Sequence, residues 1–228
     1  MGSMTSWNGT DTAGTGYLAV PESGGGPGVI VIQEWWGLVP HITDVCDRYA
    51  AEGFVALAPD LYDGVATTEP DEAGKLMMTL NLGAAVERMS GAVDHLRSLE
   101  AVTSPGVGVT GFCMGGGLAL LLACRRPDAV VACAPYYGVI PWPDAEPDWS
   151  ALSAEVRGHF AANDASFPPE RVADLEARLT GLAKTVSLEV HPDTDHAFFN
   201  DTRPEVYDAE ASAVAWADTV AFFRRTLG

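Results

Sequence analysis

Short runs of apolar, often β-branched residues alternate along the chain with longer segments whose apolar residues recur at helical spacing. The runs predict strands at Gly16–Val20, Val29–Gln33, Phe54–Ala58, Val107–Thr110, Val130–Ala134, Val156–Ala161 and Val186–Val190. The helical segments predict helices at Ile42–Ala51, Leu82–Leu99, Met114–Arg125, Pro169–Gly181 and Pro204–Thr226. Asp60–Asn81 is expected to form a loop and helix over the top of the sheet, and Val139–Ser150 a surface excursion.

Alternation of strands and helices indicates right-handed crossovers and a mostly parallel sheet. The strands are short and almost continuously apolar, which indicates a sheet buried on both faces by helices. The sequence shows no break in composition, so residues 1–228 are expected to form a single α/β domain. Met1–Ser3, placed before Met4, looks like a scar of expression and is set aside.

The formal net charge of −18 makes nucleic acids and anionic membrane surfaces unfavourable partners. No apolar stretch is long enough to span a membrane, and the first residues lack the pattern of a signal peptide. We therefore expect a cytoplasmic protein that acts on a small molecule. A monomer or small homo-oligomer is expected, without a cofactor or metal.

Gly111-Phe112-Cys113-Met114-Gly115 has the form Gly-x-nucleophile-x-Gly, with cysteine as the nucleophile. An apolar strand precedes it and a helix follows, which is the setting of a nucleophile elbow. Such a turn would lift the thiol to the N-terminus of a helix, where the thiolate is favoured. The pentapeptide alone is equally compatible with a glycine-rich turn around a buried cysteine.

A nucleophilic thiol needs a base, and the base needs an acid that orients it. Among the histidines, His196 lies in the loop after the last predicted strand, where sites form in open α/β sheets. Asp164, in the turn after Val156–Ala161, is the first choice for the acid, ahead of Asp193 and Asp195. The order Cys113, Asp164, His196 is that of nucleophile, acid and histidine in one large class of hydrolases.

Other thiols and histidines offer weaker signals. Cys46, Cys124 and Cys133 form no Cys-x-x-Cys pair and are expected to be buried apolar residues. His191, Asp193, Asp195 and His196 could be interpreted as a metal site. This interpretation is disfavoured because all four share one loop and no distant ligand is evident.

Glu34 directly follows the apolar strand Val29–Gln33 and precedes two tryptophans. It is either a turn residue that reaches water or a carboxylate at the mouth of the site. The loop after this strand supplies one donor of an oxyanion hole in elbow-containing hydrolases. The backbone N–H groups of Trp35 and Met114 are the predicted donors.

These motifs resemble the dienelactone hydrolase (carboxymethylenebutenolidase) family of α/β-hydrolases over about Pro27 to Leu227. The matching segments are Gln33-Glu34-Trp35-Trp36-Gly37, Ala58-Pro59-Asp60-Leu61-Tyr62, Gly111-Phe112-Cys113-Met114-Gly115-Gly116, Tyr136-Tyr137-Gly138 and His196-Ala197-Phe198. The resemblance implies an α/β-hydrolase fold and a triad of Cys113, Asp164 and His196. It also implies that Glu34 pairs with the resting thiol, and that an enol-lactone is hydrolysed through an acyl-thioester.

The sequence departs from the family pattern where the substrate carboxylate would bind. The family has an arginine four residues past the histidine, where this chain has Asn200, with Arg203 nearby. The segment expected to supply a second arginine, Thr67–Lys75, offers only Lys75. Lysine and asparagine do not reproduce the bidentate fork of arginine. Small activated esters are therefore considered beside enol-lactones.

Trp36, Tyr137 and Phe198 are the expected walls of a small, largely apolar acyl pocket, although such aromatic residues commonly serve only packing. Two other functions compete with hydrolysis. One is a non-catalytic thiol-sensing or binding protein on a hydrolase scaffold, and the other is an acyltransferase. The motif does not separate transfer to water from transfer to another acceptor.

Overall fold

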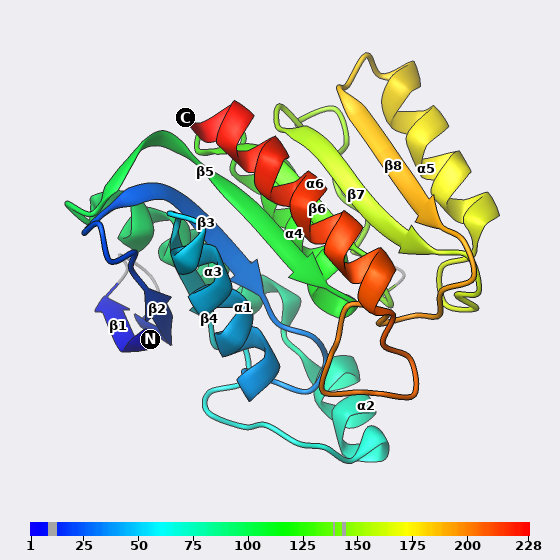
Figure 1. Cartoon of the computed structure of the whole chain (residues 1–228), viewed down its shortest axis with the longest axis horizontal. Coiled ribbons are helices and arrows are strands. Elements are labelled where there is room, and N and C mark those ends of the chain that lie inside the picture. The colour runs from blue at the N-terminus through cyan, green and yellow to red at the C-terminus, as the bar shows by residue number, and fades with distance from the viewer. Residues whose placement is uncertain (9–12, 139, 143–144) are drawn as a thin grey trace.

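The computed structural model describes residues 1–8, 13–138, 140–142 and 145–228. Eight strands of this part form one sheet, in the order β1-β2-β4-β3-β5-β6-β7-β8 (Figure 1). The β1–β2 and β2–β4 pairs are antiparallel, and all other pairs are parallel. The strands are β1 (Ser3–Asn8), β2 (Ala13–Ala19), β3 (Gly26–Ile32), β4 (Val55–Pro59), β5 (Val102–Phe112), β6 (Val130–Tyr136), β7 (Glu155–Ala161) and β8 (Val186–His191).

Helices pack on both faces of the sheet. In Figure 1, α1 and α6 lie on the near face, where their apolar sides share one cluster with the sheet. α3, α4 and α5 contribute to the cluster on the other face. The helices are α1 (Pro40–Ala51), α2 (Pro70–Thr79), α3 (Leu82–Ser98), α4 (Met114–Arg125), α5 (Pro169–Gly181) and α6 (Ala209–Leu227).

The predicted fold class, a mostly parallel sheet with helices on both faces, is confirmed. β4 is buried along its whole length, as its continuous apolar run indicates. β8 differs because it lies at the edge of the sheet, and most of its residues alternate between half-buried and exposed. The parallel strands end together at one edge, beside the loop that follows β8 (Figure 1).

Several boundaries differ from the sequence prediction. β1 was not predicted because Trp7 is its only buried residue; Ser3, which the sequence analysis set aside, pairs there with Leu18. β5 begins at Val102 rather than Val107. α6 begins at Ala209 rather than Pro204, because the side chain of Asp208 caps it by accepting a hydrogen bond from the Ala211 N–H.

The two irregular sections also have a clear outcome. Asp60–Asn81 contains α2, in which only Ala73 is buried, so apolar periodicity marks it weakly. Of the predicted excursion Val139–Ser150, residues 139, 143 and 144 lie outside the described residues. Its Trp149 is only 6% exposed and packs into the core, so the segment is not simply a surface loop. Within the described ranges, no helix has the length and apolar character required to cross a bilayer.

Candidate active site

Cys113 lies in a sharp turn between the end of β5 and the start of α4. Its backbone has φ 55° and ψ −121°, a strained conformation for a residue with a side chain. A Cβ on Gly111 would collide with the backbone of Gly115, and one on Gly115 with the carbonyl oxygens that end β3. Both glycines are therefore required by close backbone approach. The turn leaves the Cys113 side chain half-buried rather than enclosed.

Asp164 and His196 come from the loops that follow β7 and β8. Nδ1 of His196 lies 2.5 Å from Oδ2 of Asp164. The other carboxylate oxygen, Oδ1, accepts hydrogen bonds from the N–H groups of Ser166 (2.8 Å) and Phe167 (3.1 Å). The Asp164 side chain is only 1% exposed, whereas that of His196 is 25% exposed. A fixed, buried carboxylate thus orients an imidazole that solvent and a ligand can reach.

The protonation of this pair follows from its neighbours. Burial lowers the pKa of His196, but hydrogen bonding to Asp164 and Cys113, together with their negative charge, outweighs burial and raises it to about 10. Burial raises the pKa of Asp164, yet His196 and the two backbone N–H groups outweigh it and hold that pKa below its usual value. The arrangement favours a charged imidazolium beside the ionised carboxylate of Asp164.

Glu34 follows β3 and lies at the same edge of the sheet, only 1% exposed. Burial raises the pKa of its carboxyl, against the attraction of His41 and a hydrogen bond from Asn200. That hydrogen bond joins Nδ2 of Asn200 to Oε2 of Glu34 at 2.8 Å. His41, on the first turn of α1, is only 2% exposed. The sequence did not indicate that it lies near Glu34, because a histidine at the start of a helix usually has only a structural role.

The N-terminus of α4 offers free backbone donors next to the turn. The Gly116 and Gly117 N–H groups bond to the Cys113 carbonyl, while the Met114 N–H donates to no other described residue. The Trp35 N–H, in the turn after Glu34, is likewise without an acceptor within the described part of the chain. Both groups can bind a developing negative charge.

A cavity of about 390 Å³ opens over these residues. Its lining combines the chemical groups with apolar surface, and consists of Glu34, Trp35, Trp36, Met77, Cys113, Ile140, Pro141, Ser166, Phe167, Arg171, His196, Ala197 and Arg203. Of the expected walls, Trp36 belongs to it. Tyr137 and Phe198 do not: both are fully buried, and the Tyr137 ring packs between His196 and Phe198. The expectation that Tyr137 and Phe198 contact an acyl group is therefore wrong, and both rings pack behind the imidazole of His196.

Two arginines border this cavity, and Lys75 does not. The guanidinium carbon of Arg203, a residue that the sequence had already indicated, lies 5.8 Å from the centre of the Trp36 ring. Arg171, on the first turn of α5, was missed. It follows Asp164 by seven positions, in the segment that leaves the carboxyl end of β7, and that proximity was the available signal.

Metal-ligating side chains gather elsewhere. Within the described residues, His159, Glu189 and His191 are close enough to hold one ion, and they lie on β7 and β8 outside the cavity. Asp193, Asp195 and His196, which share a loop with His191, are not part of that group.

Comparison with known proteins gives a consistent result. The model of the dienelactone hydrolase family matches residues 15–227. A protein from Aquifex pyrophilus named "Protein usf" is 38% identical over 100% of both chains. A protein from Aquifex aeolicus that carries the provisional name carboxymethylenebutenolidase is 33% identical, again over 100% of both.

Solved structures agree. A chain from Klebsiella pneumoniae, provisionally named a dienelactone hydrolase, superposes with a TM-score of 0.88 at 28% identity, over 99% of this chain and 98% of that one. A dienelactone hydrolase-like promiscuous phosphotriesterase from metagenomic libraries also gives 0.88, at 22% identity over 100% and 99% of the two chains, which is a likeness of fold. The expected resemblance and the α/β-hydrolase fold are confirmed, and the chain belongs to the dienelactone hydrolase family of hydrolases.

Proposed function

We propose that this protein hydrolyses small activated esters or enol-lactones through an acyl-thioester on Cys113. The observation that carries the proposal is that His196 bonds to Asp164 at 2.5 Å and lines the same cavity as Cys113, at the edge where the strands end. His196 is the general acid and base, and Asp164 fixes its orientation. A nucleophile activated in this way needs a base beside it and a third group that orients the base.

In the first half-reaction, the Cys113 thiolate attacks the acyl carbon. The carbonyl oxygen becomes an oxyanion, which the N–H groups of Trp35 and Met114 stabilise, each contributing about 3 kcal/mol. The C–O bond of the ester then breaks, and the imidazolium of His196 gives its proton to the leaving oxygen. In a lactone the leaving oxygen stays attached to the acyl group.

In the second half-reaction, neutral His196 removes a proton from a water molecule, which attacks the thioester carbon. Collapse of the second oxyanion breaks the C–S bond and releases a carboxylic acid. The sulfur departs as a thiolate, so the thiolate–imidazolium pair is restored without a net change in protons. Asp164 stays ionised throughout, since its hydrogen bonds favour the charged form.

The cavity supports a small acyl group with an anionic end. Trp36, Met77 and Phe167 supply apolar surface, and Arg171 and Arg203 supply positive charge at the rim. These arginines take the role that the family resemblance assigns to other positions. A compact acyl chain with a free carboxylate therefore fits better than a long uncharged one.

Turnover of p-nitrophenyl acetate tests the proposal. Cys113→Ala should lose nearly all turnover, while Cys124→Ala, which removes a buried thiol from the same helix, should keep it. Equal loss in both variants, or none in Cys113→Ala, would remove Cys113 from the mechanism.

Product analysis with added alcohols and amines separates hydrolysis from acyl transfer. Reversible formation of a sulfenic acid at Cys113 under mild peroxide, without any ester turnover, would favour a thiol sensor instead.

A further inference from the structure

Three side chains of metal-ligand type lie on one face of the sheet edge, away from the proposed active site. His159 pairs in register with Glu189, and Ala161 with His191. Paired residues of parallel strands project to the same face, as do residues two apart on one strand, so His159, Glu189 and His191 share the face that packs on α6. Their ligand atoms all lie within 4.8 Å of one another.

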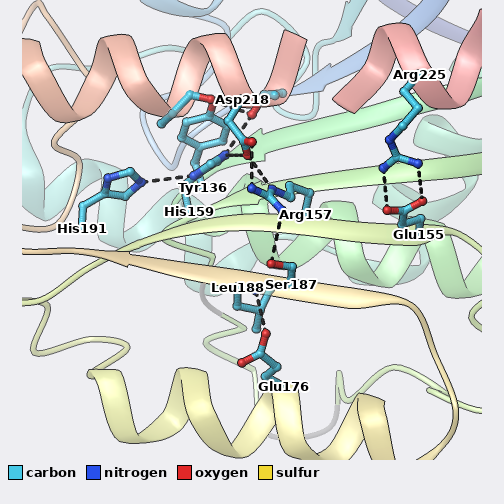
Figure 2. Close-up of polar contacts among 12 residues, drawn as sticks. Tyr136, Glu155, Arg157, His159, Glu176, Ser187, Leu188, His191, Asp218 and Arg225 are labelled. Carbon is cyan, nitrogen blue, oxygen red and sulfur yellow. Dashed lines mark hydrogen bonds and ion pairs between the residues drawn. The ribbon is translucent and has the colours of Figure 1, made fainter. Parts of the chain in front are cut away.

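The His159 ring is held in one orientation. Nε2 lies 3.1 Å from Oγ1 of Thr219 and 3.4 Å from Oδ2 of Asp218. Asp218 is itself fixed by Arg157, through contacts of 2.6 and 2.8 Å. Nδ1 then points to Nε2 of His191 at 3.1 Å, and Figure 2 shows the two rings facing each other beside α6. A carboxylate that orients the far nitrogen of a histidine is the usual support of a metal ligand.

Charge at this edge suits a cation. Burial lowers the pKa of His191, against the attraction of Glu189, Asp218 and Asp208. Burial, and then the nearby His191, lower the pKa of His159. Neutral imidazole is the form that binds metals, and burial favours that form in both rings. Carboxylates surround the pair, and the opposing charge of Arg157 is already engaged by Asp218.

We propose that His159, His191 and Glu189 form a binding site for a divalent transition-metal ion of the zinc class. Two nitrogens on a tetrahedral zinc ion lie about 3.3 Å apart, close to the spacing of the imidazoles. Glu189 is exposed, so its carboxylate can rotate to complete three protein ligands, with water as the fourth. Imidazole with carboxylate favours zinc-class ions over magnesium or calcium.

Metal binding here would join β7 to the end of β8. His191 is the last residue of β8, and its ring packs on Phe198 with centroids 5.0 Å apart. The loop between His191 and Phe198 carries His196, so an ion would fasten the base of that loop. Such an ion binds only the folded chain and raises its stability in proportion to its concentration.

The test uses full-length protein without a polyhistidine tag, in a Cys113→Ser background, so that zinc cannot bind the thiolate of the active site. Zinc is titrated in competition with a chromophoric chelator, and Co²⁺ absorption reports tetrahedral coordination. One zinc per chain is expected. His191→Gln should weaken binding about 100-fold or more, since even groups behind the ligands affect affinity 10- to 100-fold.

Glu189→Gln tests the site without disturbing the core, because this side chain is exposed, and should also weaken binding. Glu155→Gln, which alters an acid of β7 outside the group, should leave the affinity unchanged. Circular dichroism and thermal unfolding without metal establish that each variant is folded. No stoichiometric binding in the parent, or affinity unchanged in Glu189→Gln, would overturn the proposal.

Discussion

The side-chain amide of Asn200 donates a hydrogen bond of 2.8 Å to Oε2 of Glu34. Asn200 is itself held in place, because its Oδ1 accepts hydrogen bonds from the N–H and hydroxyl of Thr202. A neutral amide therefore faces a buried carboxylate at the position where the family pattern has arginine. Burial outweighs this hydrogen bond and the attraction of His41, so the pKa of Glu34 is raised.

Replacing Glu34 by Gln should change stability in a pH-dependent way. Because the folded-state pKa of Glu34 is raised, its contribution to stability is fully present below its unfolded pKa of about 4.3. That contribution is lost as pH rises through the folded-state value. Glu34→Gln keeps an acceptor for Asn200 but has no charge, so its free energy of unfolding relative to the parent should be higher at pH 8 than at pH 4. Urea unfolding of both proteins at pH 4 and at pH 8 measures this. A free energy of unfolding of the variant, relative to the parent, that is no higher at pH 8 than at pH 4 would contradict it.

The raised pKa of His196 should depend on both of its partners. Hydrogen bonding and charge from Asp164 and Cys113 favour the imidazolium, so Cys113→Ala and Asp164→Asn should each lower the pKa of His196 from about 10. Titration of the ring by ¹⁵N-resolved NMR follows this residue directly. His95, whose pKa burial lowers, is a distant internal control that should not change in either variant. A His196 pKa unaffected by Cys113→Ala would mean that ring and thiol do not interact.

Arg203 should set a preference for substrates with a free carboxylate. Nitrophenyl esters of matched size, with and without a carboxylate on the acyl group, provide the comparison. Loss of a charge-assisted hydrogen bond of about 1.5–3 kcal/mol corresponds to about a 10- to 150-fold fall in relative kcat/KM. Arg203→Gln and Arg171→Gln should show this fall, and Lys75→Gln, outside the cavity lining, should not. A preference that survives loss of both arginines would refute their role.

Gly115→Ala should damage both stability and activity, because the added methyl would strike the carbonyl oxygens of Ile32 and Gln33. We expect a loss of about 1–3 kcal/mol, typical of overpacking. Gly181 is the matched control: an added Cβ there meets nothing within 4 Å, and Gly181→Ala should stabilise the chain by about 0.4–1 kcal/mol. Chemical denaturation of both variants measures the difference, and equal effects would contradict a tightly packed turn.

The parallel sheet was predictable because its central strands are buried on both faces and leave a continuous apolar signal, as β4 does. Weakly buried elements leave no such signal. β1 buries only Trp7, and α2 only Ala73, so pairing and packing with distant segments define them. The start of a helix can depend on a single side chain. The sequence pattern predicted that the last helix begins at Pro204, but the cap formed by Asp208 makes α6 begin at Ala209.

In the candidate site, too, some features could be predicted from the sequence and others could not. Cys113, Asp164 and His196 follow three strands of a parallel sheet, and the topology alone brings such loops together. Side-chain direction is not encoded in this manner. Tyr137 and Phe198 follow strands as well, yet their rings turn inward to pack behind His196, whereas Arg171 reaches the cavity from a helix.

The central claim concerns one covalent bond, between the sulfur of Cys113 and an acyl group. Acid-quenching the protein within its first turnovers of p-nitrophenyl acetate, followed by intact-mass and peptide analysis, tests it most directly. The account predicts one acetyl group per chain, on the peptide that contains Cys113, sensitive to hydroxylamine and absent from Cys113→Ala. Acetylation on another residue, or turnover without any adduct on this peptide while Cys113→Ala keeps full activity, would contradict it.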